Sequence, residues 1–132
     1  MGKYIILALI LGHGLAHISG FLASFTSVDV GYHTDNAWIF RGDITLKSDF
    51  GKIFGMLWLI VAILFLIAAA GIIFSLSWWT NIALAAAVVS LIVIVPFWNT
   101  VPPGAKAGAV FDLIILILLT TGWREKIVSF IQ

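Results

Sequence analysis

The stretch IFGMLWLIVAILFLIAAAGIIFSL at residues 53–76 decides the fold, because it carries no charged side chain over a length that can cross a lipid bilayer. An α-helix rises ~1.5 Å per residue, so about 20 apolar residues span the ~30 Å hydrocarbon core. Three more apolar runs lie at about residues 4–25, 81–98 and 105–122. Lipid offers the backbone no hydrogen-bond partners, and these continuous runs lack the alternation of barrel strands, so all four are predicted to be helices.

The composition excludes several classes of protein. Of the 132 residues, 62% are hydrophobic and 10% are charged, whereas soluble domains have about 25% charged residues. The net charge of +1 provides no basic face for nucleic acid, and the absence of cysteine excludes disulfides and thiolate metal sites. The expected partners are therefore the lipid bilayer and either further copies of the chain or a larger membrane complex.

The expected fold class is all-α, a four-transmembrane-helix up-down bundle that forms a single integral membrane domain over residues 1–132. A polar cap loop at residues 26–51 joins the first two helices, and its aromatic residues favour an ordered structure. The residues around Gly42 and Asp43 also fit a small β-hairpin. The charged side chains of the loop fit a solvated surface, or else some of its residues line a ligand mouth. The candidates for that mouth are Tyr32, His33, Trp38 and Arg41.

The orientation rests on few charges. An even number of spans places both termini on one side of the membrane. The basic residues divide almost evenly, with Lys3, Arg124 and Lys126 on the terminal side and Arg41, Lys47, Lys52 and Lys106 on the other. Since Lys3 and the Arg124–Lys126 cluster abut the spans directly, the termini are expected in the cytoplasm. Lys3 before an apolar run also fits a signal peptide, but the run continues past Ala16 and holds histidines, which favours a span.

Small residues recur at the four-residue spacing that stacks side chains on one helix face. On a helical wheel, one half of the first helix holds this row together with both histidines, and it is predicted to pack against the other helices. The opposite half, which includes Ile10 and Gly14, is predicted to face lipid. Small residues allow the backbones of membrane helices to approach closely. The residues predicted to pack helices in this way are Ala8, Gly12, Ala16, Gly20, Gly51, Gly55, Gly104 and Gly108.

Three ionisable residues fall inside predicted spans: His13, His17 and Asp112. A charged group there costs several kcal/mol if it is unpaired, so each is a candidate for a functional site. The two histidines have the i, i+4 spacing that lets them share a metal ion, and Asp112 is expected at a depth where it can contact His17. They fit a transition-metal site in which Asp112 is a third ligand or supports a ligand and His33 completes the set. They also fit a site for a proton or small ligand, or hydrogen bonds that join helices.

Two more specific interpretations, a zinc protease and a haem protein with two axial histidines, do not fit the residues. The HGLAH segment at residues 13–17 has the histidine spacing of zinc proteases, but Gly14 stands where their general-base glutamate belongs. A haem with two axial histidines needs ligands on opposite faces of the ring. His13 and His17 leave one helix in similar directions, so haem is disfavoured. The cofactor is left open, and a transition metal is the candidate.

The segment LGHGLAHISGF at residues 11–21, with GKIFGMLW at residues 51–58, resembles small uncharacterised prokaryotic four-helix integral membrane proteins. Their first helix has the pattern HGxAHxxGF, and some of them are labelled transporter permeases. By size and number of spans the chain is more distantly similar to DoxX-like proteins. The resemblance implies a four-helix bundle in a prokaryotic cell membrane, and it implies no particular activity.

The residues favour a non-enzymatic membrane protein. Such a protein would bind a small ligand or ion within the bundle, or serve as a subunit of a membrane assembly. One alternative is a metal-dependent or redox membrane enzyme that uses His13, His17 and Asp112. The other is a purely structural subunit in which the histidines join helices.

Overall fold

The protein is an all-α bundle in which four helical segments are long and apolar enough to cross a membrane. The computed structural model describes residues 2–40 and 42–131. The first of these segments comprises α1 (Gly2–Ala16) and α2 (Ile18–Phe25), and the second is α3 (Asp49–Ile73). The third comprises α4 (Trp79–Ile94) with the short 3₁₀ helix η1 (Val95–Phe97), and the fourth is α5 (Pro103–Thr120). A helix that the sequence analysis did not assign, α6 (Trp123–Ile131), follows α5.

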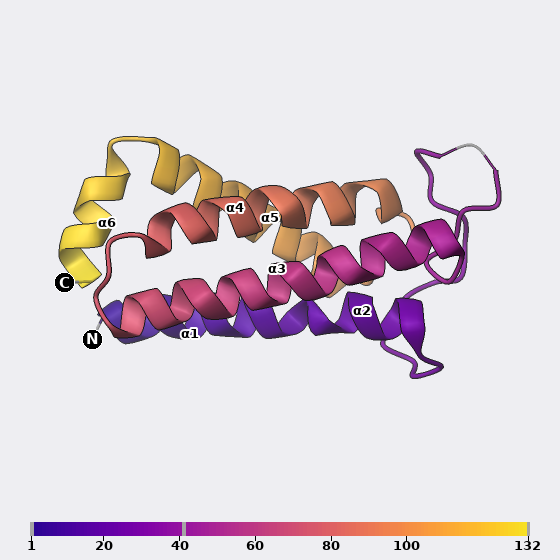
Figure 1. Cartoon of the computed structure of the whole chain (residues 1–132). Coiled ribbons are helices and arrows are strands. Elements are labelled where there is room, and N and C mark those ends of the chain that lie inside the picture. Colours follow the sequence, from indigo (N-terminus) through magenta and orange to yellow (C-terminus); the bar gives the residue numbers. More distant parts are fainter. Residues whose placement is uncertain (1, 41, 132) are drawn as a thin grey trace.

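The central element of the bundle is α3, which packs against α1 and α2 on one side and against α4 on the other (Figure 1). Next to α4 lies α5, and both chain ends lie at the same end of the bundle (Figure 1). Trp58 and Phe65 of α3 and Phe97 of η1 are fully buried. The exposed side chains of the spans are mostly large and apolar, as the lipid-facing surface of a membrane bundle requires.

Local signals set the helix boundaries. The side chain of Ser48 accepts a hydrogen bond from the Gly51 amide at 3.1 Å, so α3 begins at Asp49, before the apolar run predicted from residue 53. Pro103 occupies the first turn of α5, where its missing amide costs no helical hydrogen bond.

The first span is interrupted at His17, between α1 and α2. The His17 amide bonds to Gly14 O and the Gly20 amide bonds to His17 O, both at 3.2 Å. These bonds reach back three residues rather than four, so the helix is locally tightened. The backbone of the span continues in the same general direction, but His17 sits at a joint within it.

The packing face of the first span differs from the expectation. Ala8, Gly12 and Ala16 are exposed, whereas Ile10 and Gly14, which were predicted to face lipid, are buried. Successive members of an i, i+4 row turn by ~40° around a helix, since each residue turns by ~100°. The row of small residues on the first span therefore begins beside α5 and turns gradually around the helix. It reaches the interface with α3 only at Gly20. There, a Cβ on Gly20 would enter the Trp58 ring, and one on Gly55 would meet Ser24.

The cap loop is ordered but contains no strand in its described part, so the expected β-hairpin is wrong. One backbone bond, from Ala37 N to Ile44 O at 2.8 Å, crosses between its limbs. Other polar groups of the loop bond instead to the turn between η1 and α5. The His33 amide bonds to Thr100 O at 2.8 Å, and Asn99 Nδ2 bonds to Asn36 O at 2.7 Å. These bonds tie the loop down onto the bundle in place of a two-stranded ladder.

Candidate functional site

Four polar side chains from three spans meet inside the bundle. His13 belongs to α1 and His17 to the joint before α2, while Ser90 comes from α4 and Asp112 from α5. Asp112 and Ser90 are fully buried, His17 is 5% exposed, and the His13 side chain is 9% exposed. We refer to these four residues as the polar cluster.

Hydrogen bonds connect the cluster from end to end. His13 Nε2 lies 2.8 Å from Asp112 Oδ1, and the Ser90 hydroxyl donates to Asp112 Oδ2 at 2.5 Å. Ser90 Oγ also lies 3.1 Å from His17 Nε2. The expected contact between His17 and Asp112 is therefore replaced by a contact between His13 and Asp112, because Ser90 stands between Asp112 and His17.

The hydrogen bonds of the cluster constrain which side-chain atom acts as the donor in each contact. A serine hydroxyl has one hydrogen to give. Because Ser90 gives that hydrogen to Asp112, His17 Nε2 must carry the hydrogen of its bond to Ser90. Asp112 accepts from Ser90 at Oδ2, while Oδ1 shares one hydrogen with His13 Nε2. Without a bound ion, His17 thus directs an Nε2 hydrogen toward Ser90.

Aromatic rings surround the two imidazoles. Phe65 of α3 lies edge-on to His13 with ring centroids 4.8 Å apart, and it is stacked on His17 at 5.8 Å. Phe111 of α5 lies edge-on to His13 at 4.8 Å. The imidazoles contact each other at 4.7 Å in an edge-on arrangement. Such packing fixes the ring orientations and keeps the surroundings of the cluster apolar.

A groove between α1 and α5 reaches the cluster at His13. Its volume is about 320 Å³, and it is lined by Ala8, Leu9, Gly12, His13, Gly104, Ala107, Gly108 and Phe111. The predicted small-residue rows of α1 and α5 therefore face each other across the groove and are not in close contact. A Cβ on Gly12 or Gly104 would meet nothing within 4 Å, whereas one on Gly108 would lie 3.1 Å from His13 Cε1.

The geometry suits a metal ion. His13, His17 and Asp112 each offer one ligand atom, and the three atoms lie within 4.8 Å of one another. Zinc takes imidazole nitrogen and carboxylate oxygen at about 2.0–2.2 Å, so neighbouring ligands of a tetrahedral ion stand roughly 3.3 Å apart. Coordination would therefore require the most widely spaced ligand atoms to approach each other by up to roughly 1.5 Å. Ser90 would then hold the second carboxylate oxygen, as outer residues do for many metal ligands.

The cap candidates lie elsewhere. Tyr32 and His33 line a pocket in the cap loop, so His33 is not a member of the polar cluster. Trp38 lies outside that pocket, because its indole donates to Val95 O at 2.6 Å and its amide to Asn99 Oδ1 at 3.2 Å. Arg41 falls outside the described residues.

Sequence reasoning did not assign Ser90 to the site. Its signal was present, since Ser90 is a single polar side chain deep within the apolar stretch of α4. Serine in a membrane helix usually bonds to its own backbone, however, so the residue type alone did not indicate a cross-helix contact. Only the packing of α4 against α5 brings it to Asp112.

Comparisons with known proteins add no identity: no family model, no curated protein and no solved structure matches this sequence.

Proposed function

We propose that this small membrane protein binds a divalent transition-metal ion within its bundle, with His13, His17 and Asp112 as ligands. The observation that carries the proposal is the convergence of two imidazole nitrogens and a carboxylate oxygen, all within 4.8 Å of one another. Nitrogen and oxygen ligands of this kind suit zinc and its neighbours in the first transition series.

The electrostatics support the proposal. A carboxylate buried between membrane spans is costly unless it is paired, and a bound cation compensates its charge more completely than neutral hydrogen-bond donors do. The ion would replace the hydrogen bond between His13 and Asp112, while Ser90 keeps its bond to the second carboxylate oxygen.

Binding rather than catalysis is proposed because the groove beside the site contributes no further acid or base among its described lining residues. Besides His13 it offers only small, aliphatic and aromatic residues. The rival function is structural: the same hydrogen bonds join α1, α4 and α5 without any ion. Interhelical hydrogen bonds of this kind contribute about 0.6 kcal/mol each on average.

The test measures metal in the purified protein. Wild type, His13→Ala/His17→Ala and Asp112→Asn are purified in mild detergent, incubated with Zn²⁺, desalted and analysed by elemental mass spectrometry. Asn at position 112 retains an acceptor oxygen but removes the charge. His33→Gln is the matched control, because His33 lies in the cap loop outside the cluster.

We expect one zinc ion per chain in wild type and in His33→Gln, with loss of most of it in the other two variants. Retention of zinc by the double variant would place the ion elsewhere. A folded wild type that binds no zinc would overturn the proposal and leave the structural function.

A further inference from the structure

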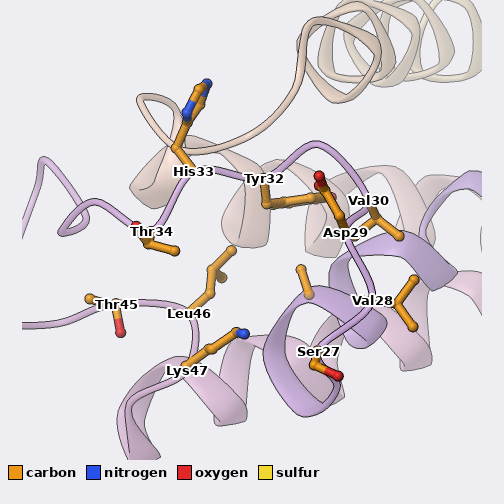
Figure 2. A pocket seen from close by; sticks show the side chains of 11 residues that line it. Ser27, Val28, Asp29, Val30, Tyr32, His33, Thr34, Thr45, Leu46 and Lys47 are labelled. Atoms are coloured by element: carbon orange, nitrogen blue, oxygen red, sulfur yellow. The ribbon is translucent and has the colours of Figure 1, made fainter.

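A polar hollow in the cap loop is separate from the polar cluster. It has a volume of about 330 Å³ and lies between the limb that leaves α2, the segment at residues 32–34 and the limb that returns to α3 (Figure 2). Ala23 of α2 and Leu46 contribute apolar surface to it. Small-molecule sites begin at about 300 Å³, so the hollow has room for a compact polar group.

The loop that forms the hollow is held in place. Asp29 Oδ1 accepts a hydrogen bond from the Gly31 amide at 2.9 Å, and Gly31 has a φ of +80°, which glycine adopts without strain. The Tyr32 ring stands edge-on to Trp58 with centroids 5.7 Å apart, and its hydroxyl lies 3.3 Å from Ser19 Oγ. Burial raises the pKa of the Tyr32 hydroxyl, against the opposing effect of the Ser19 bond, so it remains a neutral donor.

Opposite charges stand on opposite sides of the hollow. Lys47 projects from the returning limb and Asp29 lies on the departing limb, whereas the His33 ring points away (Figure 2). Among the described residues, Lys47 forms no ion pair with a carboxylate, whereas the nearby Lys52 pairs with Asp49 at 3.3 Å in the first turn of α3. Three further lining residues, Ser27, Thr34 and Thr45, carry hydroxyl groups.

This arrangement complements a zwitterion. An anionic oxygen group would accept a charge-assisted hydrogen bond from Lys47, and a cationic N–H group would donate to Asp29. The carboxylate discriminates between cations, because a primary ammonium has hydrogens to donate and a quaternary ammonium has none.

The depth of the hollow identifies the source of the zwitterion. The first span, Gly2–Phe25, has 24 residues. At ~1.5 Å per residue it is ~36 Å long, which exceeds the ~30 Å hydrocarbon core. If the excess is shared, each end extends ~3 Å beyond the core, so the span leaves the core close to Phe25 and the cap loop that follows lies at the level of the lipid head groups. We propose that the cap-loop hollow binds the head group of an ethanolamine phospholipid, with its phosphate at Lys47 and its ammonium at Asp29.

The test is a lipid competition read by native mass spectrometry. The detergent-purified protein is mixed with equal amounts of dioleoyl phosphatidylethanolamine, phosphatidylcholine and phosphatidylglycerol, and the retained lipids are counted. We expect wild type to retain phosphatidylethanolamine about fivefold more than either other lipid. Phosphatidylcholine has the same charges without N–H donors, and phosphatidylglycerol lacks the cation, so both halves of the recognition are tested.

Two pairs of variants give matched controls. Lys47→Ala and Asp29→Asn should abolish the preference, while Lys52→Ala and Asp49→Asn, which alter a charged pair outside the hollow, should retain it. Asn at position 29 still offers an oxygen to the Gly31 amide, so the turn is preserved while the charge is removed.

Equal retention of the three lipids by wild type, or equal effects of Lys47→Ala and Lys52→Ala, would overturn the inference. Excess water-soluble glycerophosphoethanolamine should displace the lipid. If it does not, the lipid is held by its tails, and recognition by the hollow is refuted. None of these readouts depends on metal, so the inference stands or falls separately from the proposed function.

Discussion

Gly12 and Gly108 show that the effect of an added side chain depends on the immediate surroundings of the residue. Both are glycines that line the groove between α1 and α5, and both sit beside His13. A side chain at Gly12 would project into open space, whereas one at Gly108 would press on the imidazole edge, 3.1 Å from Cε1. The sequence presents these two positions as equivalent members of small-residue rows.

Gly108→Ala should displace the His13 ring by a few tenths of an ångström and weaken zinc binding by about tenfold, the lower range for changes around metal ligands. Gly12→Ala should leave the affinity unchanged. Both substitutions gain the same helical preference of alanine over glycine, so their difference isolates the contact with His13. Competition with a zinc-sensitive dye measures the two dissociation constants. Equal affinities in the two variants would show that the His13 ring adapts without loss.

Between elements, the decisive contact is that of α2 with α3. Gly20 brings the α2 backbone onto the face of Trp58, and Gly55 brings α3 onto Ser24. Lipid tails are as apolar as leucine, so membrane helices associate through close van der Waals packing rather than through a hydrophobic driving force. The joint at His17 allows α2 to keep this contact while α1 presents His13 to α5.

Gly20→Ala should lower the stability of the bundle by about 1–3 kcal/mol, because the added methyl group has no room beside the buried Trp58 ring. Gly12→Ala is the control on the same span, since its methyl group meets nothing within 4 Å. Thermal unfolding in detergent, followed by circular dichroism, should show a lower midpoint for Gly20→Ala alone. A wild-type midpoint for Gly20→Ala would mean that α2 and α3 separate at no cost.

At the scale of the whole molecule, polar contacts close the end of the bundle where the termini meet (Figure 1). Arg124 Nη2 donates to Thr80 Oγ1 at 2.8 Å and to Asn81 Oδ1 at 2.7 Å, which fastens α6 to the start of α4. Lys3 Nζ donates to Ser75 Oγ at 2.6 Å, which fastens α1 to the turn after α3. Ile131 is buried, so α6 also contributes an apolar contact.

Arg124→Ala should loosen α6 while the four spans stay intact. Loss of the charged donor removes about 1.5–3 kcal/mol of local hydrogen bonding, so amide protection in residues 123–131 should fall by at least tenfold. Lys126→Ala is the control, because that side chain lies over the Trp123 ring of the same helix. Hydrogen exchange with mass spectrometry resolves the two cases, and unchanged protection in Arg124→Ala would show that apolar contacts alone hold α6.

Some features of the site were predictable and others were not. The sequence singled out His13, His17 and Asp112 because ionisable groups are rare in spans. It paired Asp112 with the wrong histidine, since helix depth alone cannot reveal that Ser90 occupies the space beside His17. The sequence analysis named Tyr32 and His33 as candidates to line a ligand mouth, and both line the cap-loop hollow. It did not single out the charged lining residues Asp29 and Lys47.

The sequence by itself determined that the fold is helical, roughly where the four span-length segments lie, and that polar groups are buried among them. The physical reason is local: a backbone in lipid must satisfy its own hydrogen bonds, so apolar length and composition suffice to predict these segments. Only the tertiary structure decided which faces meet. The rotation of α1 relative to α3, the position of Ser90 and the folding of the cap onto Asn99 and Thr100 depend on contacts between residues far apart in the chain.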